Sequence, residues 1–170
     1  MQYAIRRART KDVRAIRALI DANAASGRLL DKATVTLYED VQEFWVVCDP
    51  EDRVVGCGAL HVMWEDLAEI RTIAVEDGHQ GHGVGDLLVG ELLATARQLG
   101  VSRVFVLTFA VPFFARHGFE EIKGEAATPE VYAELLRSYD EGVAEFLDLD
   151  RVKPNTLGNT RMLLRLTGPR

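Results

Sequence analysis

The sequence predicts an α+β (α/β) fold in which helices flank a mixed β-sheet. Two β-rich runs, 44–49 and 53–64, flank a polar turn, and this order is typical of an antiparallel hairpin. Between residues 67 and 109, a strand, a glycine-rich turn, a helix and an apolar strand follow one another, and that order predicts a parallel strand pair. The length of 170 residues suits one compact domain, so we expect a single domain over residues 1–170.

In the N-terminal part, a short strand over 3–9 is expected to precede a helix over 11–25. Thr10 is the expected N-cap, because small polar side chains accept hydrogen bonds from the first N–H groups of a helix. The apolar residues of this helix recur at helical spacing: Val13, Ile16, Leu19 and Ile20. Gly27 is expected to end it, and residues 29–42 are predicted to form a second helix or a loop.

In the C-terminal part, the strand over 67–76 is expected to alternate regularly, which places four side chains on one face: Glu69, Arg71, Ile73 and Val75. The helix after the glycine-rich turn is expected to run through Leu99 and to stop at Gly100. The elements expected after it are a strand over 103–109, a short helix that stops at Gly118, a strand over 118–122, a helix capped by Thr128 and a last strand over 161–166.

Composition argues against several classes of protein. No apolar run approaches the roughly 20 residues of a membrane helix, and no apolar segment follows the basic start, so we expect a cytoplasmic protein without a membrane span. The net charge is −6, with acids and bases interspersed, which gives no footprint for nucleic acid. Cys48 and Cys57 each lie in an apolar β-rich run, where free cysteine usually behaves as a small buried hydrophobe. A small-molecule partner fits this composition best.

The glycine-rich turn, Gln80 to Gly85, carries the strongest chemical signal. It leaves a strand and enters a helix, so backbone N–H groups without intrahelical partners converge at the positive end of the helix dipole. Glycines let a pyrophosphate approach this backbone. The loop is neither a Walker A motif nor a dinucleotide-binding fingerprint. By themselves the glycines are equally compatible with a tight turn.

The strand, the pattern Gln-x-x-Gly-x-Gly and the helix together resemble the acetyl-CoA signature of GNAT N-acetyltransferases, and Phe113–Phe119 resembles the second motif of that family. Other segments are similar to short actinobacterial-type amino-acid N-acetyltransferases, the N-acetylglutamate synthases: EFWVV, GCGAL, AEIRTIAV, VFVLTF and KPNTLGNTRMLL. The resemblance covers nearly the whole chain. It implies the GNAT fold, in which two parallel strands splay apart around the cofactor, with acetyl-CoA as co-substrate and no metal.

The same resemblance implies which residues bind acetyl-CoA. The main chain of three strand residues would line the pantetheine: Ile73, Ala74 and Val75. The loop and the first helical turn would receive the pyrophosphate: Gln80, Gly81, His82, Gly83, Val84, Gly85 and Asp86.

An amino-acid amine is protonated near neutral pH and needs a general base before it attacks a thioester. Our candidate is Glu69, because it lies on the cofactor strand on the expected face of Ile73, and similar enzymes often carry a glutamate near this point. Alternatively, Glu69 only forms an ion pair with a cation such as Arg71. The main-chain N–H near Ile73 is a candidate donor to the developing oxyanion, and no nucleophilic residue is required.

One residue departs from the family pattern. Many members have a tyrosine that protonates the departing thiolate, and this chain has Phe114 in its place, so water or another donor such as His117 must supply the proton. His61, His79 and His82 show no metal-ligand pattern and are expected in turns or on the surface.

The expected acceptor is the α-amino group of an amino acid, with L-glutamate favoured, giving N-acetylglutamate for arginine biosynthesis. Its two carboxylates need fixed cations or N–H donors. The candidates are Lys32, Arg71, Asn159 and Arg161, and the resemblance implies that the segments of Lys32 and of Asn159 to Arg161 border the acceptor. Acetylation of another amine or of protein lysines, a non-catalytic acetyl-CoA-sensing module and a homodimer stay open.

Overall fold

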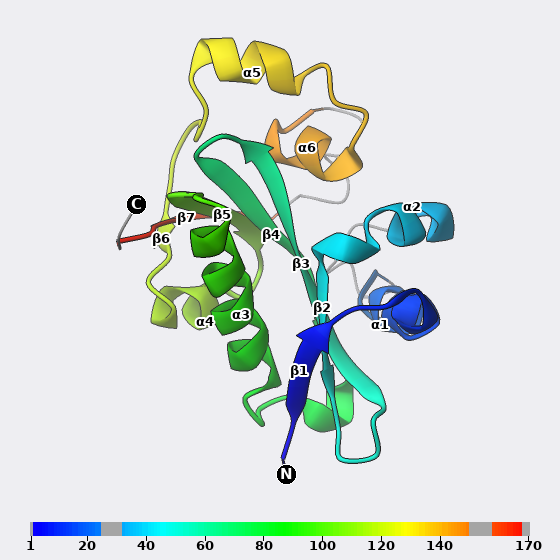
Figure 1. Cartoon of the computed structure of the whole chain (residues 1–170). Coiled ribbons are helices and arrows are strands. Elements are labelled where there is room, and N and C mark those ends of the chain that lie inside the picture. The colour runs from blue at the N-terminus through cyan, green and yellow to red at the C-terminus, as the bar shows by residue number, and fades with distance from the viewer. Residues whose placement is uncertain (1, 25–31, 150–157, 168–170) are drawn as a thin grey trace. The chain divides into compact units, whose positions relative to one another are not determined.

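The computed structural model describes residues 2–24, 32–149 and 158–167. Its strands form one mixed sheet in the order β1-β2-β3-β4-β5-β7-β6 (Figure 1). These strands are β1 (Ala4–Arg7), β2 (Phe44–Cys48), β3 (Val54–Trp64), β4 (Leu67–Val75), β5 (Arg103–Thr108), β6 (Glu120–Glu121) and β7 (Thr160–Arg165). The helices are α1 (Val13–Ala24), α2 (Thr34–Glu39), α3 (Val84–Gln98), α4 (Val111–Arg116), α5 (Pro129–Leu135) and α6 (Glu141–Phe146).

The two pairings that define the predicted fold class are present. Strands β2 and β3 form an antiparallel hairpin, and β4 runs parallel to β5. The α+β fold class is therefore confirmed. The chain divides into two compact units, Met1–His61 with Ile70–Thr95 and Val62–Glu69 with Ala96–Arg170. Whether these units behave as the single domain that we expect stays a prediction.

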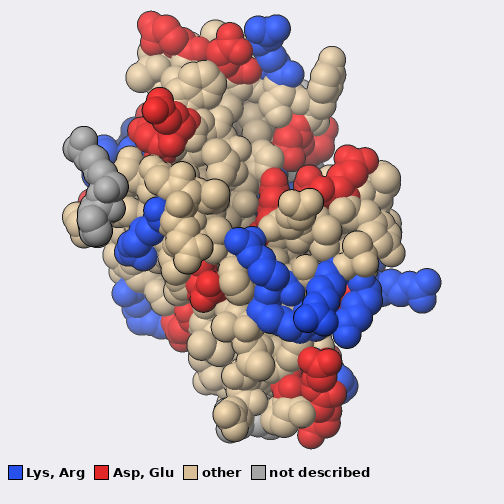
Figure 2. All heavy atoms as spheres, viewed as in Figure 1, with Lys and Arg blue, Asp and Glu red and all other residues tan. Residues whose placement is uncertain are grey.

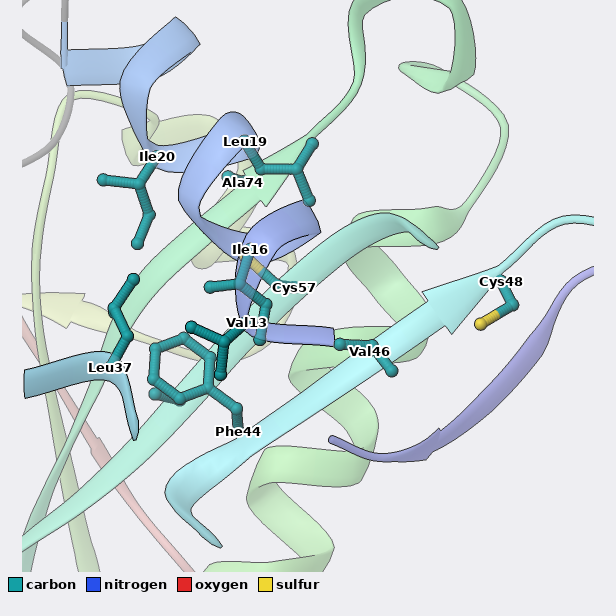
Figure 3. Packing of buried hydrophobic residues seen from close by; sticks show 11 residues of the cluster. Val13, Ile16, Leu19, Ile20, Leu37, Phe44, Val46, Cys48, Cys57 and Ala74 are labelled. Carbon is teal, nitrogen blue, oxygen red and sulfur yellow. The ribbon is translucent and has the colours of Figure 1, made fainter. Parts of the chain in front are cut away.

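In the first unit, helices cover both faces of the sheet (Figure 1). The apolar stripe of α1 packs against β2 and β3, where Val13 and Ile16 meet Phe44 and Val46 (Figure 3). On the other face, Val84 and Leu88 of α3 pack against Val47 and Val55. The alternation of β2 and the helical spacing of α1 produce this two-sided core, because each pattern buries one set of side chains per face.

Close packing of α3 on β3 depends on two glycines. A Cβ added at Gly56 would lie 2.6 Å from Val84 Cγ1, and one added at Gly58 would lie 3.1 Å from Leu92 Cδ1. A side chain at Gly56 would therefore push the helix away from the strand. Because Val84 is the first residue of α3, the position of the helix N-terminus depends on this contact.

The start of α1 differs from the prediction. Residues Thr10–Asp12 form a short 3-10 turn, α1 begins at Val13, and Thr10 is not the cap. The N-cap residue is Arg9, and the carboxylate of Asp12, the last residue of the turn, reaches back to accept its N–H at 2.7 Å. The same carboxylate receives both terminal nitrogens of Arg6, at 2.7 and 3.0 Å, so it is satisfied although it is buried. Gly27, the expected helix end, lies outside the described residues.

In the second unit, α5 and α6 supply one side of a core on β5 and β7. This core includes Leu135 and Phe146 from the helices and Phe105 and Leu163 from the strands. Thr128 caps α5 as predicted, accepting a hydrogen bond from the N–H of Val131. The positive φ of the glycines that follow α3 and α4, 83° at Gly100 and 90° at Gly118, also agrees with the predicted helix ends. Helix α6 was not predicted.

The buried pair of Arg6 and Asp12 gives a stability prediction. The hydrogen bond from Arg6 holds the pKa of the Asp12 carboxyl below its usual range. We expect Asp12→Asn to lower the free energy of unfolding by about 1–3 kcal/mol at neutral pH, because the variant loses a charge-assisted bond to a half-buried guanidinium. Urea denaturation of both proteins measures this difference.

The pH dependence checks the cause. A depressed pKa contributes stability above the unfolded-state pKa of roughly 4, and this contribution is lost as the pH falls towards the folded-state pKa. The difference in the free energy of unfolding between wild type and Asp12→Asn should therefore be constant from about pH 5 to pH 8 and should shrink at lower pH. Asp21→Asn is the control, since Asp21 also pairs with an arginine, Arg17, but its side chain is 60% exposed. This substitution should lower the free energy of unfolding by about 0.5 kcal/mol or less. Equal losses in the two variants would contradict the prediction.

Candidate functional site

The loop between β4 and α3 is tied back to the strand that precedes it. The side-chain amide of Gln80 donates to the carbonyl of Val75 at 3.3 Å and to the carboxylate of Asp77 at 2.9 Å. Gly81 and Gly83 have φ angles of 73° and 83°, in the left-handed region that favours glycine. The two interpretations of the glycines, a tight turn and a phosphate-binding loop, are therefore compatible, because the same residues make the turn and leave its backbone accessible.

The geometry of this loop fits an anion. The hydrogen bond from Leu87 N–H to Gly83 O, at 3.0 Å, closes the first turn of α3, so the N–H groups of Val84 and Gly85 lie at the positive end of the helix dipole. Apart from its own chain neighbours, a Cβ built at Gly81 or Gly83 meets no protein atom within 4 Å, which leaves the space above these backbones open. A pyrophosphate such as that of acetyl-CoA suits this place.

The other candidate residues of the loop contribute in different ways. Val84 is buried against the β-sheet, so only its main chain can face a ligand. His82 is exposed, and its Nδ1 lies 2.8 Å from the carbonyl oxygen of Gln80. Asp86 is exposed in the first turn, where a carboxylate favours the helix dipole but repels an anion. The glycine and valine N–H groups are thus the better anion donors.

The end of β4 is irregular. Thr72 has a φ of 58°, and its carbonyl accepts a hydrogen bond from the Cys57 thiol at 3.6 Å. Beyond it, Ile73 and Val75 pack with the α3 cluster, and Ala74 packs with the α1 cluster. A left-handed residue interrupts the two-residue repeat of a strand. The argument that placed Glu69 on the face of Ile73 therefore fails at Thr72.

In the second unit, the structure brings Glu69 and Arg161 to one aromatic residue. Glu69 is 2% exposed and stands in register with Phe105 on the parallel strand β5. Arg161 on β7 stands opposite Leu107, and its guanidinium lies 5.0 Å from the centre of the Phe105 ring. Residues in register across neighbouring strands share a face of the sheet. The candidate base and a candidate acceptor cation are thus both neighbours of Phe105.

The remaining acceptor candidates lie in different surroundings. Arg71 on β4 is buried, and Lys32 is half-buried shortly before α2, with its carbonyl accepting a hydrogen bond from Arg17. Both belong to the first unit. Asn159 is half-buried and directly precedes β7 in the second unit. Their contacts with an acceptor stay predictions.

The histidines show one feature that sequence reasoning missed. His61 lies within β3 and not in a turn, and its Nδ1 is 2.7 Å from the Glu43 carboxylate, a pair whose members are 18 residues apart. His79 is buried beside Tyr3, with 2.9 Å between Nδ1 and the phenol oxygen. Among the described residues, no group of three or more His, Cys, Asp or Glu side chains is placed to hold a metal ion.

Phe114 and the cysteines are core residues. Phe114 is 4% exposed and packs edge to face on Phe113 and Phe119. Both cysteines are buried free thiols, as expected, and burial raises the pKa of Cys57 to about 12. Neither thiol is suited to nucleophilic attack, because the reactive species is the thiolate.

Basic side chains are less evenly spread than the composition indicated. Lys and Arg gather over the region of β1 and α1 (Figure 2), where the sequence contains Arg6, Arg7, Arg9, Lys11, Arg14 and Arg17. Several are engaged within the protein: Arg6 with Asp12, Arg17 with Asp21, and Arg7 with the Trp45 ring at 4.6 Å. In the part of the chain that the structure describes, no helix is both long and apolar enough to cross a membrane.

Comparison with known proteins agrees with the geometry. The acetyltransferase (GNAT) family model matches residues 26–119. An amino-acid acetyltransferase of Mycobacterium tuberculosis is 61% identical over 164 residues, which are 95% of this chain and 94% of the relative. The crystal structure of Rv2747 from Mycobacterium tuberculosis in complex with CoA and NLQ has a TM-score of 0.93 and 60% identity, covering 96% of this chain and 99% of that one.

A more distant structure shares the fold. N-acetylglutamate synthase from Neisseria gonorrhoeae, complexed with coenzyme A and N-acetyl-glutamate, has a TM-score of 0.78 and 24% identity, covering 99% of this chain and 36% of that one. The expected fold, reaction class and co-substrate are therefore confirmed. The chain belongs to the GNAT family of acetyltransferases and is an acyl-transfer enzyme that uses acetyl-CoA.

Proposed function

We propose that this enzyme transfers the acetyl group of acetyl-CoA to the α-amino group of an amino acid, with L-glutamate as the favoured acceptor and N-acetylglutamate for arginine biosynthesis as the product. The observation that supports the proposal is that Glu69 stands in register with Phe105 while the Arg161 guanidinium lies over the ring of the same residue. One group suits proton removal from an amine and the other suits a carboxylate. The 61% identical amino-acid acetyltransferase supports the same acceptor class.

In the proposed reaction, the first turn of α3 and the glycine backbone bind the pyrophosphate, and the main chain of Ile73 to Val75 lies along the pantetheine. Glu69 takes a proton from the ammonium group, the amine nitrogen forms a bond to the acetyl carbonyl carbon, and the carbon–sulfur bond breaks. The main-chain N–H of Ile73 donates to the carbonyl oxygen as negative charge develops there. As the carbon–sulfur bond breaks, the nitrogen loses its second proton and the thiolate gains one. Phe114 has no titratable group, so we assign the transfer of this proton from the nitrogen to the sulfur to water.

Acceptor choice rests on cations. Arg161 is assigned to one carboxylate of the amino acid, and Lys32, Arg71 and Asn159 are the candidates for further contacts. A second carboxylate, as in glutamate, needs a second fixed donor, because an unpaired buried anion is costly. The cytoplasmic location and the homodimer stay predictions.

One alternative has an observation behind it. A non-catalytic acetyl-CoA sensor would bind the co-substrate without turnover, and Phe114 in place of a tyrosine would not handicap it. The burial of Glu69 favours an enzyme, because ionisable groups removed from water are enriched at functional sites.

The acceptor class is tested with the wild-type enzyme. Mass spectrometry of products from an equimolar amino-acid mixture, followed by separate rate measurements, should show glutamate as the best acceptor. Amines that lack the α-carboxylate, such as γ-aminobutyrate, should react more slowly by about tenfold or more, because the cation assigned to that carboxylate is left unpaired. If a lysine peptide or such an amine proves best, the amino-acid assignment is wrong. Binding of acetyl-CoA without any product would favour the sensor.

Gly83→Val tests the glycine loop. A side chain at Gly83 would fill the open space over the backbone. It should weaken acetyl-CoA binding by about tenfold or more. Gly100→Val is a matched control, because Gly100 has the same φ of 83° and the same open surroundings but lies after the other end of α3. Both variants should lose similar stability. Isothermal titration that shows equal acetyl-CoA affinities in the two folded variants would disprove the role of the loop.

Glu69→Gln tests the base. The substitution keeps the shape of the side chain and removes its ability to accept a proton, so turnover should fall by ~10²-fold or more while acetyl-CoA affinity stays close to normal. Part of the loss should be recovered at high pH, where more of the amine is unprotonated. Glu121→Gln, on an exposed position of β6, serves as the control. Normal turnover of Glu69→Gln at neutral pH would show that the proton leaves by another route.

A further inference from the structure

Arg161 is held by two aromatic residues and one carbonyl. Its guanidinium carbon lies 5.0 Å from the centre of the Phe105 ring and 5.6 Å from that of Phe146. Its Nη1 donates to the carbonyl oxygen of Phe146 at 2.8 Å. The two rings are themselves in edge-to-face contact, with centroids 4.8 Å apart, and both are fully buried. The position of the guanidinium is therefore set from three directions.

The carbonyl acceptor belongs to the last residue of α6, the helix that the sequence did not reveal. Asp140 starts this helix by accepting the N–H of Val143 at 2.9 Å, and Val143 and Phe146 anchor it in the core. A cation at the C-terminal end of a helix is favoured by the helix dipole. In this way a short helix brings both a ring and a carbonyl to a residue on β7.

Among the described residues, these contacts use only part of the guanidinium. A guanidinium has several N–H donors in a planar fork; the Phe146 carbonyl accepts one of them, and the rings contact the cation without accepting a hydrogen bond. Within residues 2–24, 32–149 and 158–167, no carboxylate lies within ion-pair distance of Arg161. A half-buried cation in this condition would gain from an anion that binds its remaining donors as a fork.

We propose that Phe105 and Phe146 form an aromatic clamp that positions Arg161 to receive a carboxylate of the acceptor, so that the clamp sets acceptor affinity. The inference rests on the proposed function, in which Arg161 contacts that carboxylate. Phe105 and Phe146 are positioning residues, since they act through Arg161. The ring faces attract the cation and restrict the rotamers of the Arg161 side chain before the acceptor binds. Less conformational entropy is then lost when the acceptor binds.

A double-mutant cycle tests the clamp. Phe146→Met removes the ring at similar volume, and Phe146→Leu is a second variant in case the first does not fold. We expect either one to raise KM for the best amino-acid acceptor by about threefold or more, with little change in KM for acetyl-CoA. Arg161→Ala should raise the acceptor KM by roughly tenfold or more. In the Arg161→Ala background, the Phe146 substitution should then add nothing.

Phe119→Met is the matched control. Phe119 is a buried phenylalanine of the same unit that packs on Phe114 and makes no described contact with Arg161. Its substitution should lower the melting temperature about as much as Phe146→Met and leave the acceptor KM unchanged. If both substitutions change KM equally, or if Phe146→Met folds and keeps a normal KM, the clamp is only structural and the proposal is overturned. An additive effect in the Arg161→Ala background would overturn it as well.

The same measurements separate this inference from the function on which it rests. If Arg161→Ala leaves the acceptor KM unchanged while amino acids are still acetylated, the clamp proposal fails and the proposed reaction stands. If product analysis shows that amino acids are not acceptors, the proposed function fails first, whatever the variants of Phe146 do.

Discussion

The contact between α3 and β3 is the constraint on which the co-substrate site depends. Gly56 lets Val84 approach β3 more closely than any side chain would permit. Since Val84 opens α3, this packing places the positive end of the helix beside the end of β4. Gly81 and Gly83 then bend the loop without covering it. A core contact and an anion site are therefore parts of one arrangement, and a change in the first would move the second.

Phe105 has a comparable part in the second unit. It fills the core between β5 and the helices, it stands in register with Glu69, and its ring carries the guanidinium of Arg161. One apolar residue is thus a neighbour of two ionisable side chains. The chemistry of proton removal and carboxylate binding, as proposed, rests on an aromatic residue that takes part in neither.

Sequence signals predicted a structural feature correctly where that feature depends on neighbouring residues alone. The helix cap at Thr128 and the helix end at Gly100 were predicted correctly, because each depends on hydrogen bonds or dihedral angles within a few residues. Thr10 failed as a cap because the turn begins one residue earlier: Arg9 is the N-cap, and its N–H is bound by Asp12, which Arg6 of the preceding strand holds in place. The ion pair that fixes this start cannot be judged from the propensity of one residue.

By itself, the sequence determined the family, the mixed sheet, the order of its main elements and the glycine loop, since periodicity, turn residues and motif spacing are properties of the chain. The tertiary structure alone decided the left-handed backbone at Thr72, the pairing of His61 with Glu43, the existence of α6 and the position of the Arg161 guanidinium over the Phe105 ring. Each of these depends on contacts between residues far apart in the chain, and their free energies arise only when the sheet has formed.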